Sequence, residues 1–234
     1  MPEMPLFQKI SPGQGRDFVV GDIHGSFDRL FLDLKALGFD PKQDRLFSVG
    51  DLVDRGAQSA LATSFLALDW VHAVRGNHEQ MLLDLYAQGV PDEDMVREFT
   101  EPWWWRLDRG QRAAMLDAFA ALPVALELET AKGRVGVLHA EVPFEMDWAT
   151  FVRRLEAGDP DVIDSALWER GRFEHRDHSG VPGVDFVLVG HTTHFEAEVR
   201  RGNCVYLDTG AVYGVQGRHP KGRFSIVQPT SFFD

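Results

Sequence analysis

The sequence has little cysteine, little positive charge and no long apolar run, and each absence narrows what the protein can be. Cys204 is the single cysteine, so no disulfide forms within the chain and nothing requires an oxidising compartment. The formal net charge of −12 argues against a protein that grips duplex nucleic acid by its phosphates. No apolar run approaches the length of a membrane span, and the N-terminus lacks a signal-peptide stretch. We therefore expect a cytoplasmic protein without a membrane or a nucleic-acid duplex as partner. An anionic small substrate stays open, because a local site can be positive on an acidic protein.

The composition is otherwise that of an ordinary globular protein. Hydrophobic residues make up 44% and charged residues 26% of the 234 residues, which is enough for a sizeable core. Apolar runs predict strands at 18–20, 46–49 and 70–74, and helical spacing predicts a helix after each. This alternation predicts right-handed crossovers and a parallel sheet.

The alternation stops at about residue 91. Residues 91–122 have helical spacing and contain Trp103, Trp104 and Trp105, so we expect a helical insertion in which these tryptophans pack rather than line a substrate site. Further strands are predicted at 124–128, 135–138, 186–189, 204–207 and 224–227, with one short helix and a polar loop within 144–183 and an irregular lead-in over 1–15. The fold class is α/β, a single domain over 1–234 with two sheets.

Chemically distinctive residues stand where the predicted strands end. The segment 46–56, LFSVGDLVDRG, passes from apolar residues through a glycine to Asp51 and further charged residues. The segments RDFVVGDIHGS at 16–26 and VHAVRGNHEQ at 71–80 have the same order. The carboxyl ends of strands are where open α/β sheets usually bind ligands, so we expect these side chains to converge.

Six candidate metal ligands follow strand-like runs in this way. They are Asp22, His24, Asp51, Asn77, His139 and His191. A lone histidine after a strand is more often structural, but three motifs at successive strand ends with two further histidines favour a metal site. Carboxylate, imidazole and amide ligands suit Mn, Fe, Co or Zn, and the set is too large for one tetrahedral ion. Two ions that share one carboxylate would fit a hydrolytic centre.

Together these segments resemble the phosphoprotein-phosphatase family of binuclear metallophosphoesterases. GDIHG, GDLVDRG and GNHE form the signature of that family, and the later LHA, VGHT and DTGA segments match it as well. The resemblance spans about residues 16–228 and is greatest to the bacterial and bacteriophage lambda-type serine/threonine protein phosphatases. It implies the calcineurin-like metallophosphoesterase fold, an α/β/β/α sandwich of two sheets flanked by helices.

The resemblance also implies a role for each site residue. Asp22 and His24 would hold a first divalent ion, Asp51 would bridge two ions, and Asn77, His139 and His191 would hold the second. Mn²⁺ is the expected metal, with Fe, Zn, Co and Ni as alternatives. Asn77 is also counted among the groups at the phosphate.

The remaining roles concern the phosphate and the proton. Arg55 would bind the phosphate, His78 would protonate the leaving alkoxide, and Asp54 would orient His78. The family has a further phosphate-binding arginine after a tryptophan. Arg170 in the sequence WER is the expected match, and Arg172 is the competing choice.

The expected activity is that of a protein phosphatase. It would remove phosphate from serine and threonine, with tyrosine open, by direct attack of a hydroxide that bridges the metals, and a phosphoprotein or phosphopeptide would meet a monomeric enzyme. The alternative is a symmetrical diadenosine tetraphosphate hydrolase, which shares the motifs. A non-catalytic metal-binding module is less expected, because such a scaffold would have lost part of the set. Glu141 stands where many relatives have glycine, and its charge would disfavour nucleotide polyphosphates if it faced the groove.

Overall fold

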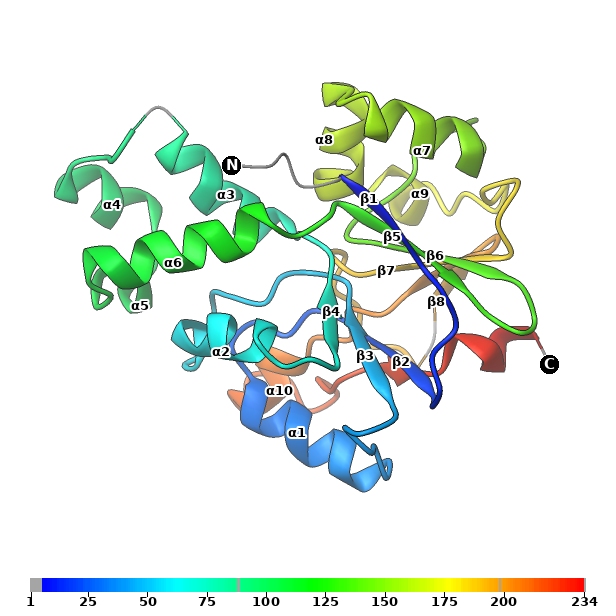
Figure 1. The fold of residues 1–234 in the computed structure, drawn as a ribbon, viewed down its shortest axis with the longest axis horizontal. Helices are drawn as coiled ribbons and strands as arrows, with labels where there is room; N and C mark the ends of the chain where they lie inside the picture. Colours follow the sequence, from blue (N-terminus) through cyan, green and yellow to red (C-terminus); the bar gives the residue numbers. More distant parts are fainter. Residues whose placement is uncertain (1–5, 88, 198, 234) are drawn as a thin grey trace.

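Two β-sheets form the centre of the computed structural model, which describes residues 6–87, 89–197 and 199–233 (Figure 1). One sheet has four strands in the order β10-β2-β3-β4. β2 (Asp17–Val20), β3 (Arg45–Ser48) and β4 (Val71–Ala73) run parallel, and β10 (Ile226–Val227) is antiparallel to β2. The predicted parallel β-α alternation is therefore confirmed.

The second sheet is mixed and has six strands in the order β1-β5-β6-β7-β9-β8. Its strands are β1 (Phe7–Ile10), β5 (Ala125–Glu129), β6 (Arg134–Leu138), β7 (Phe186–Val189), β8 (Val199–Arg201) and β9 (Cys204–Tyr206). β6, β7 and β9 are mutually parallel neighbours, β1 is parallel to β5, and the pairs β5–β6 and β8–β9 are antiparallel.

An apolar core joins the two sheets. Val19 and Phe47 of the four-stranded sheet pack in it with Val137 and Leu188 of the six-stranded sheet. Phe18, the neighbour of Val19 on β2, instead belongs to a second core under the helices. Successive side chains of a strand point to opposite faces, so a strand such as β2, which is apolar from Phe18 to Val20, is suited to a middle layer.

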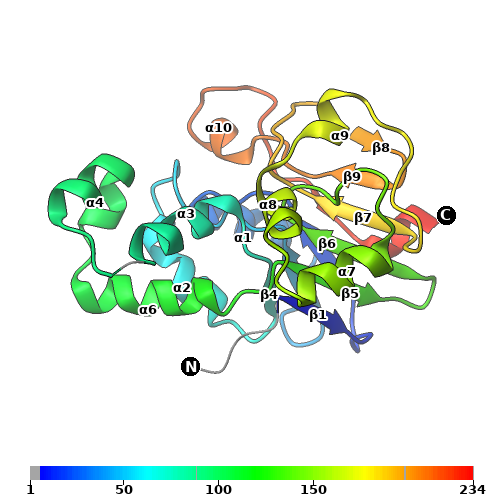
Figure 2. The ribbon, with the colours of Figure 1, turned by 90° about the horizontal axis from the view of Figure 1, so that it is seen from above.

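Helices cover the outer face of the four-stranded sheet. They are α1 (Phe27–Ala36), α2 (Ala62–Leu66) after the 3-10 turn η1 (Ser59–Leu61), and α3 (Asn77–Tyr86). Residues 91–122 form α4 (Glu93–Phe99), α5 (Pro102–Trp105) and α6 (Arg109–Ala120). Trp104 and Phe119 of this helical segment share a core with Leu30 and Phe65. Figures 1 and 2 place α4 and α6 at one side of the molecule, away from α7.

A second group of helices covers the six-stranded sheet. It comprises α7 (Trp148–Glu156), α8 (Pro160–Trp168) and α9 (Gly171–Glu174). Trp148, Phe151 and Leu155 of α7 pack against Val187 of β7. α10 (Ala211–Val215) and the 3-10 helix η2 (Pro229–Phe233) complete the chain. The helix–sheet–sheet–helix architecture of the calcineurin-like fold is confirmed. Among the described residues, no helix combines the length and apolarity needed to cross a membrane.

The structure differs from the sequence prediction in three places. β1 lies within the predicted irregular lead-in, of which residues 1–5 fall outside the described residues. β8 was not predicted either. Residues 144–183 contain α7, α8 and α9 rather than one short helix, because Asp147 and Asp159 each accept a backbone N–H and so start separate helices.

Candidate active site

Loops after β2, β3 and β4 of one sheet and after β6 and β7 of the other carry the predicted site residues, and the structure brings these loops together. The loops lie so close together that a glycine is required before some of the polar residues, as at Gly76 and Gly190. A Cβ on Gly76 would lie 2.3 Å from the backbone nitrogen of Asp51, and one on Gly190 would lie 2.0 Å from Oδ1 of Asp22. The order of apolar run, glycine and ligand thus marks places where two site loops touch.

Several site residues have a left-handed backbone. They are His24 (φ 45°), Asp51 (φ 51°), Asp54 (φ 67°), Arg55 (φ 64°) and His191 (φ 65°). A non-glycine residue in this region costs about 1–2 kcal/mol, so it persists only where its surroundings hold it. The concentration of such residues at one place is typical of a functional site.

Glu79 holds part of this strained backbone. Its carboxylate is fully buried and accepts backbone N–H groups from Asp51 at 3.0 Å, Leu52 at 2.8 Å and Gly76 at 2.9 Å. Burial, with the nearby charge of Asp51, raises the pKa of Glu79 to about 7. The sequence alone assigned no site role to this glutamate.

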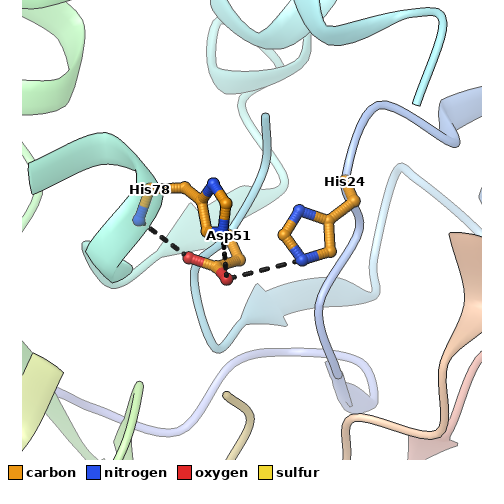
Figure 3. A group of neighbouring side chains, drawn as sticks. All are labelled: His24, Asp51 and His78. Carbon is orange, nitrogen blue, oxygen red and sulfur yellow. Dashed lines mark hydrogen bonds and ion pairs between the residues drawn. The ribbon is translucent and has the colours of Figure 1, made fainter. Parts of the chain in front are cut away.

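The carboxylate of Asp51 lies between the side chains of His24 and His78 (Figure 3) and also faces His139. Its Oδ2 is 3.4 Å from Nε2 of His24, and its Oδ1 is 3.4 Å from Nε2 of His139. Oδ2 of Asp22 lies 3.9 Å from the same His24 nitrogen. Asp51 therefore faces two histidines with different oxygens, which is the arrangement that a bridging carboxylate requires.

Asn77 connects the remaining candidates. Its Oδ1 lies 2.8 Å from Nε2 of His139 and 3.0 Å from Nδ1 of His191. The backbone N–H of His191 donates to Oδ1 of Asp22 at 3.1 Å. All six predicted ligands thus lie in one connected cluster around Asp51, and Asp22 lies close to His24 and also to His139 and His191.

His24 and His139, which face Asp51, have the tautomer that can bind a cation through Nε2. Nδ1 of His24 donates to the carbonyl of Val53 at 2.7 Å, and Nδ1 of His139 donates to the carbonyl of Val49 at 2.8 Å. A carbonyl only accepts, so Nδ1 carries the proton and the Nε2 lone pair faces the carboxylates. Burial lowers the pKa of His24 to about 3 and lowers that of His139, which keeps both rings neutral. This donor set fits divalent cations.

The buried carboxylates give the same indication. Burial, and then the charges of Asp208 and Asp51, raise the pKa of Asp22 well above its usual value. Burial also raises the pKa of Asp208, whose oxygens accept from Thr193 Oγ1 and from the N–H of Gly210. A divalent cation would offset the repulsion among these groups. Asp208 was not among the predicted site residues, although the DTGA segment that contains it was noticed.

His78 and Asp54 form a pair beside this cluster. Nδ1 of His78 donates to Oδ2 of Asp54 at 2.6 Å, and the backbone N–H of His78 donates to Oδ1 of Asp51 at 3.1 Å. Burial lowers the pKa of His78, but the two aspartates outweigh it and raise the pKa to about 9. Nε1 of Trp103 donates to the other oxygen of Asp54 at 2.7 Å. Trp103 does pack in the core, yet it also contacts the site, which sequence analysis did not find.

The guanidinium of Arg55 contacts two histidines, His24 after β2 and His78 after β4. Its Nη1 donates to Nε2 of His24, and its Nη2 lies 3.1 Å from Nε2 of His78. The lone pair of His24 can serve either Arg55 or a cation, so the two compete for it. The backbone of Arg55 is held on both sides, because its N–H donates to Glu101 at 2.8 Å and its carbonyl accepts from Gln216 at 2.6 Å.

The structure separates the two arginines that sequence analysis left open. The side chain of Arg172 is fully buried and donates to the carbonyl of Val142 at 2.8 Å and to Asp177 at 2.6 Å. Arg170 is exposed, and its guanidinium makes no hydrogen bond to a residue that the structure describes. Burial lowers the pKa of His191 to about 3, and the charge of Arg170 contributes to that shift. Arg170 is therefore the arginine that is available beside the cluster.

Glu141 does not face the cluster as the sequence argument required. It is buried, and its two oxygens accept the backbone N–H groups of Gly171 at 3.0 Å and Arg172 at 2.8 Å, at the start of α9. The carboxylate thus meets unpaired helical N–H groups instead of substrate. The condition for its charge to disfavour nucleotide polyphosphates, that Glu141 faces the groove, is therefore not met.

The two-sheet fold and the aspartate–histidine–asparagine cluster together define a metallophosphoesterase. Residues 18–212 match the model of the calcineurin-like phosphoesterases, and the chain belongs to this family of hydrolases.

Known proteins similar to the chain carry two different names. Serine/threonine-protein phosphatase 1 of Salmonella typhimurium strain LT2 is 35% identical over 217 residues, which cover 90% of this chain and 94% of that protein. The symmetrical bis(5'-nucleosyl)-tetraphosphatase of Methylococcus capsulatus is 31% identical over 175 residues, 67% of this chain and 61% of that protein. A solved structure provisionally named a diadenosine tetraphosphatase is 22% identical, with a TM-score of 0.61 over 95% of this chain and 92% of its own. The last likeness bears on the fold alone.

Proposed function

We propose that this protein is a binuclear metal-dependent protein phosphatase that hydrolyses phosphoserine and phosphothreonine, with phosphotyrosine as a further substrate to be tested. The observation that carries the proposal is the position of Asp51, which faces His24 and His139 with different oxygens and lies 3.8 Å from Nε2 of His78. Candidate ligands and a candidate proton donor therefore meet at one carboxylate.

The donor set supports two divalent ions. Asp22 and His24 would hold one ion, Asn77, His139 and His191 would hold the other, and Asp51 would contact both. Such ions supply a water molecule that is nucleophilic at neutral pH and positive charge beside the phosphoryl oxygens. Mn²⁺ is the ion we propose, and Fe, Zn, Co and Ni are alternatives with the same donor preferences.

The residues outside the ligand set would act on the substrate itself. Arg55 and Arg170 would bind the phosphate oxygens as charged hydrogen-bond donors. His78 would give its proton to the leaving oxygen, and Asp54 would orient the ring and stabilise its charge. The hydrogen bond from Nδ1 to Asp54 favours the protonated ring and so supports this role.

A groove beside Arg55 supports a peptide over a dinucleotide. It has a volume of about 620 Å³ and is lined by apolar side chains such as Pro102 and Val215 and by the carboxylates of Asp28 and Glu101. Neither carboxylate has an ion-pair partner within the described ranges, whereas Arg29 in the same wall is paired with Asp33 at 2.9 Å. Arg55, which also lines the groove, would bind the reacting phosphate, so the further phosphates of a dinucleoside tetraphosphate would meet the two carboxylates and be repelled.

The test compares the two substrate classes directly. With added Mn²⁺, we expect kcat/KM for a phosphoserine peptide to exceed that for diadenosine tetraphosphate. The reverse order, with ADP as the product, would assign the chain to the symmetrical hydrolases. Glu101→Gln keeps an oxygen for the Arg55 N–H but removes the charge, so it should raise the relative rate on the dinucleotide. Asp161→Asn, an exposed site on α8, changes the net charge equally and should leave the ratio unchanged.

A further inference from the structure

The carboxylate of Asp54 is held by two aromatic N–H groups. His78 Nδ1 donates to Oδ2 at 2.6 Å, and Trp103 Nε1 donates to Oδ1 at 2.7 Å. A carboxylate with one partner can still rotate about its Cβ–Cγ bond, because that torsion is broad. Rigid donors on both oxygens fix the plane of the group, and with it the orientation of the His78 ring.

Trp103 is itself held from outside the catalytic loops. Its ring meets Trp104 edge-on, with centroids 5.4 Å apart, and Trp104 meets Tyr86 in the same way at 5.9 Å. Trp104 is fully buried and Trp103 is 8% exposed. The position of the Trp103 N–H is therefore set by the packing of α5 against α3, and not by the loop that carries Asp54.

The segment before α5 holds the residue next to Asp54 as well. Glu101 accepts the backbone N–H of Arg55 at 2.8 Å. Asp54 and Arg55 have consecutive left-handed φ angles of 67° and 64°. Two adjacent non-glycine residues in this region need external support, and residues 101–103 supply one contact to each.

We propose that Trp103 is a positioning residue for proton donation, because it fixes the carboxylate that orients His78. This inference rests on the proposed role of His78 as the proton donor. Loss of the indole N–H frees Oδ1 of Asp54 to turn toward water, and the imidazole then spends less time aimed at the leaving oxygen. The effect is confined to reactions whose leaving group needs a proton.

The experiment compares Trp103→Phe with Trp104→Phe. Each change keeps an aromatic ring and removes one indole N–H, but that of Trp104 donates to the hydroxyl of Tyr86 at 3.3 Å and not to Asp54. The rates are measured on a phosphoserine peptide, whose alkoxide needs a proton, and on p-nitrophenyl phosphate, whose phenolate does not. Trp103→Phe should lower the peptide rate roughly tenfold more than the p-nitrophenyl rate, which is a fraction of the roughly 10²–10⁴ that a general acid supplies. Trp104→Phe should leave the ratio of the two rates unchanged. If the ratio in Trp103→Phe also equals that of the wild type, the proposal is overturned.

Two comparisons separate this inference from the function on which it rests. If His78→Asn shows the bias between substrates and Trp103→Phe does not, the inference fails and the proton donor stands. If His78→Asn shows no bias, the assignment of the donor fails first. The double variant should show no more bias than His78→Asn alone, because both changes act on one proton transfer. If the substrate bias of the double variant equals the combined effects of the two single variants, Trp103 does not act through His78.

A spectroscopic measurement tests the contact without disturbing the packing. Asp54→Asn weakens the acceptor, so the indole N–H resonance of Trp103 should shift while that of Trp104 stays in place. The Trp103 resonance is identified by its loss in Trp103→Phe. A Trp103 resonance that does not move in Asp54→Asn would overturn the proposal even if the phenylalanine variants proved too unstable to assay.

Discussion

The carboxylate of Glu141 accepts the backbone N–H of Arg172 at 2.8 Å and so closes the N-terminal end of α9. Its second oxygen takes the N–H of Gly171 at 3.0 Å. Arg170, the arginine proposed to bind phosphate, immediately precedes these two residues. Glu141 therefore supports the backbone beside the phosphate site and does not meet the substrate.

The first prediction follows from that position. Glu141→Ala leaves two N–H groups without their partner and should lower the free energy of unfolding by about 1–3 kcal/mol. Turnover of the phosphopeptide and of the dinucleotide should fall by the same factor. Exposed Glu169→Ala serves as the control and should change stability little. A selective gain on the dinucleotide in Glu141→Ala would mean that the charge reaches substrate after all.

The second prediction concerns the shared ligand. Asp51→Asn removes the negative charge that faces both histidines, so binding of both ions should weaken and turnover should nearly vanish while the fold survives. Elemental analysis after gel filtration measures the metal content. Exposed Asp117→Asn on α6 is the matched change and should keep metal and activity. Two ions per chain with normal turnover in Asp51→Asn would refute the bridging role.

The third prediction separates three arginines. Arg55→Ala should keep both ions but weaken transition-state stabilisation by about 2–4 kcal/mol, seen in kcat/KM, and free phosphate should inhibit less. Arg170→Ala should weaken phosphate inhibition in the same direction. Arg172→Ala should instead lower the melting temperature, because the Arg172 guanidinium donates to buried carbonyls and to Asp177. Phosphate inhibition that changes in Arg172→Ala alone, at wild-type stability, would reverse this assignment.

The site residues show which parts of the active site can be predicted from sequence. The ligands were found because each follows an apolar run, in most cases with a glycine at its end, and both are local signals. Trp103 and Gln216 were missed as site residues because their contacts with Asp54 and Arg55 join positions 49 and 161 residues apart. The sequence also shows that Glu141 lies two residues after the candidate ligand His139. No local pattern, however, predicts toward which side of a loop its carboxylate points.

The fold shows the same limit. The central strands were predicted because both of their faces are buried, so that they read as continuous apolar runs. β1 has only four residues and exposes Gln8 and Lys9, because it lies at the edge of the six-stranded sheet. Its partner β5 begins at Ala125. A short edge strand with a distant partner carries little periodic signal of its own.

The fourth prediction is a pH dependence away from the active site. The hydrogen bond from the Arg16 side chain, outweighing burial, lowers the pKa of Asp44 from 3.8 to about 2. A folded-state pKa below the unfolded value contributes stability that is complete above pH 3.8 and is lost as the pH falls toward 2. Asp44→Asn should therefore cost on the order of 2 kcal/mol at neutral pH, and the deficit should shrink in acid.

Urea unfolding across this pH range tests the Asp44 prediction. Asp33→Asn is the control, because Asp33 forms an exposed pair with Arg29 on one helix and such pairs contribute little. A deficit in Asp44→Asn that stays constant down to pH 2 would show that the charge of Asp44 is not the source of the stability.

The most direct test of the central claim is a metal titration that follows two products at once. Protein freed of metal by a chelator is titrated with Mn²⁺ while phosphate release from a phosphoserine peptide and ADP release from diadenosine tetraphosphate are recorded. The account predicts that phosphate release rises with bound metal, levels off near two ions per chain and exceeds ADP release throughout. Phosphate release that does not depend on metal, or ADP as the main product, would contradict it.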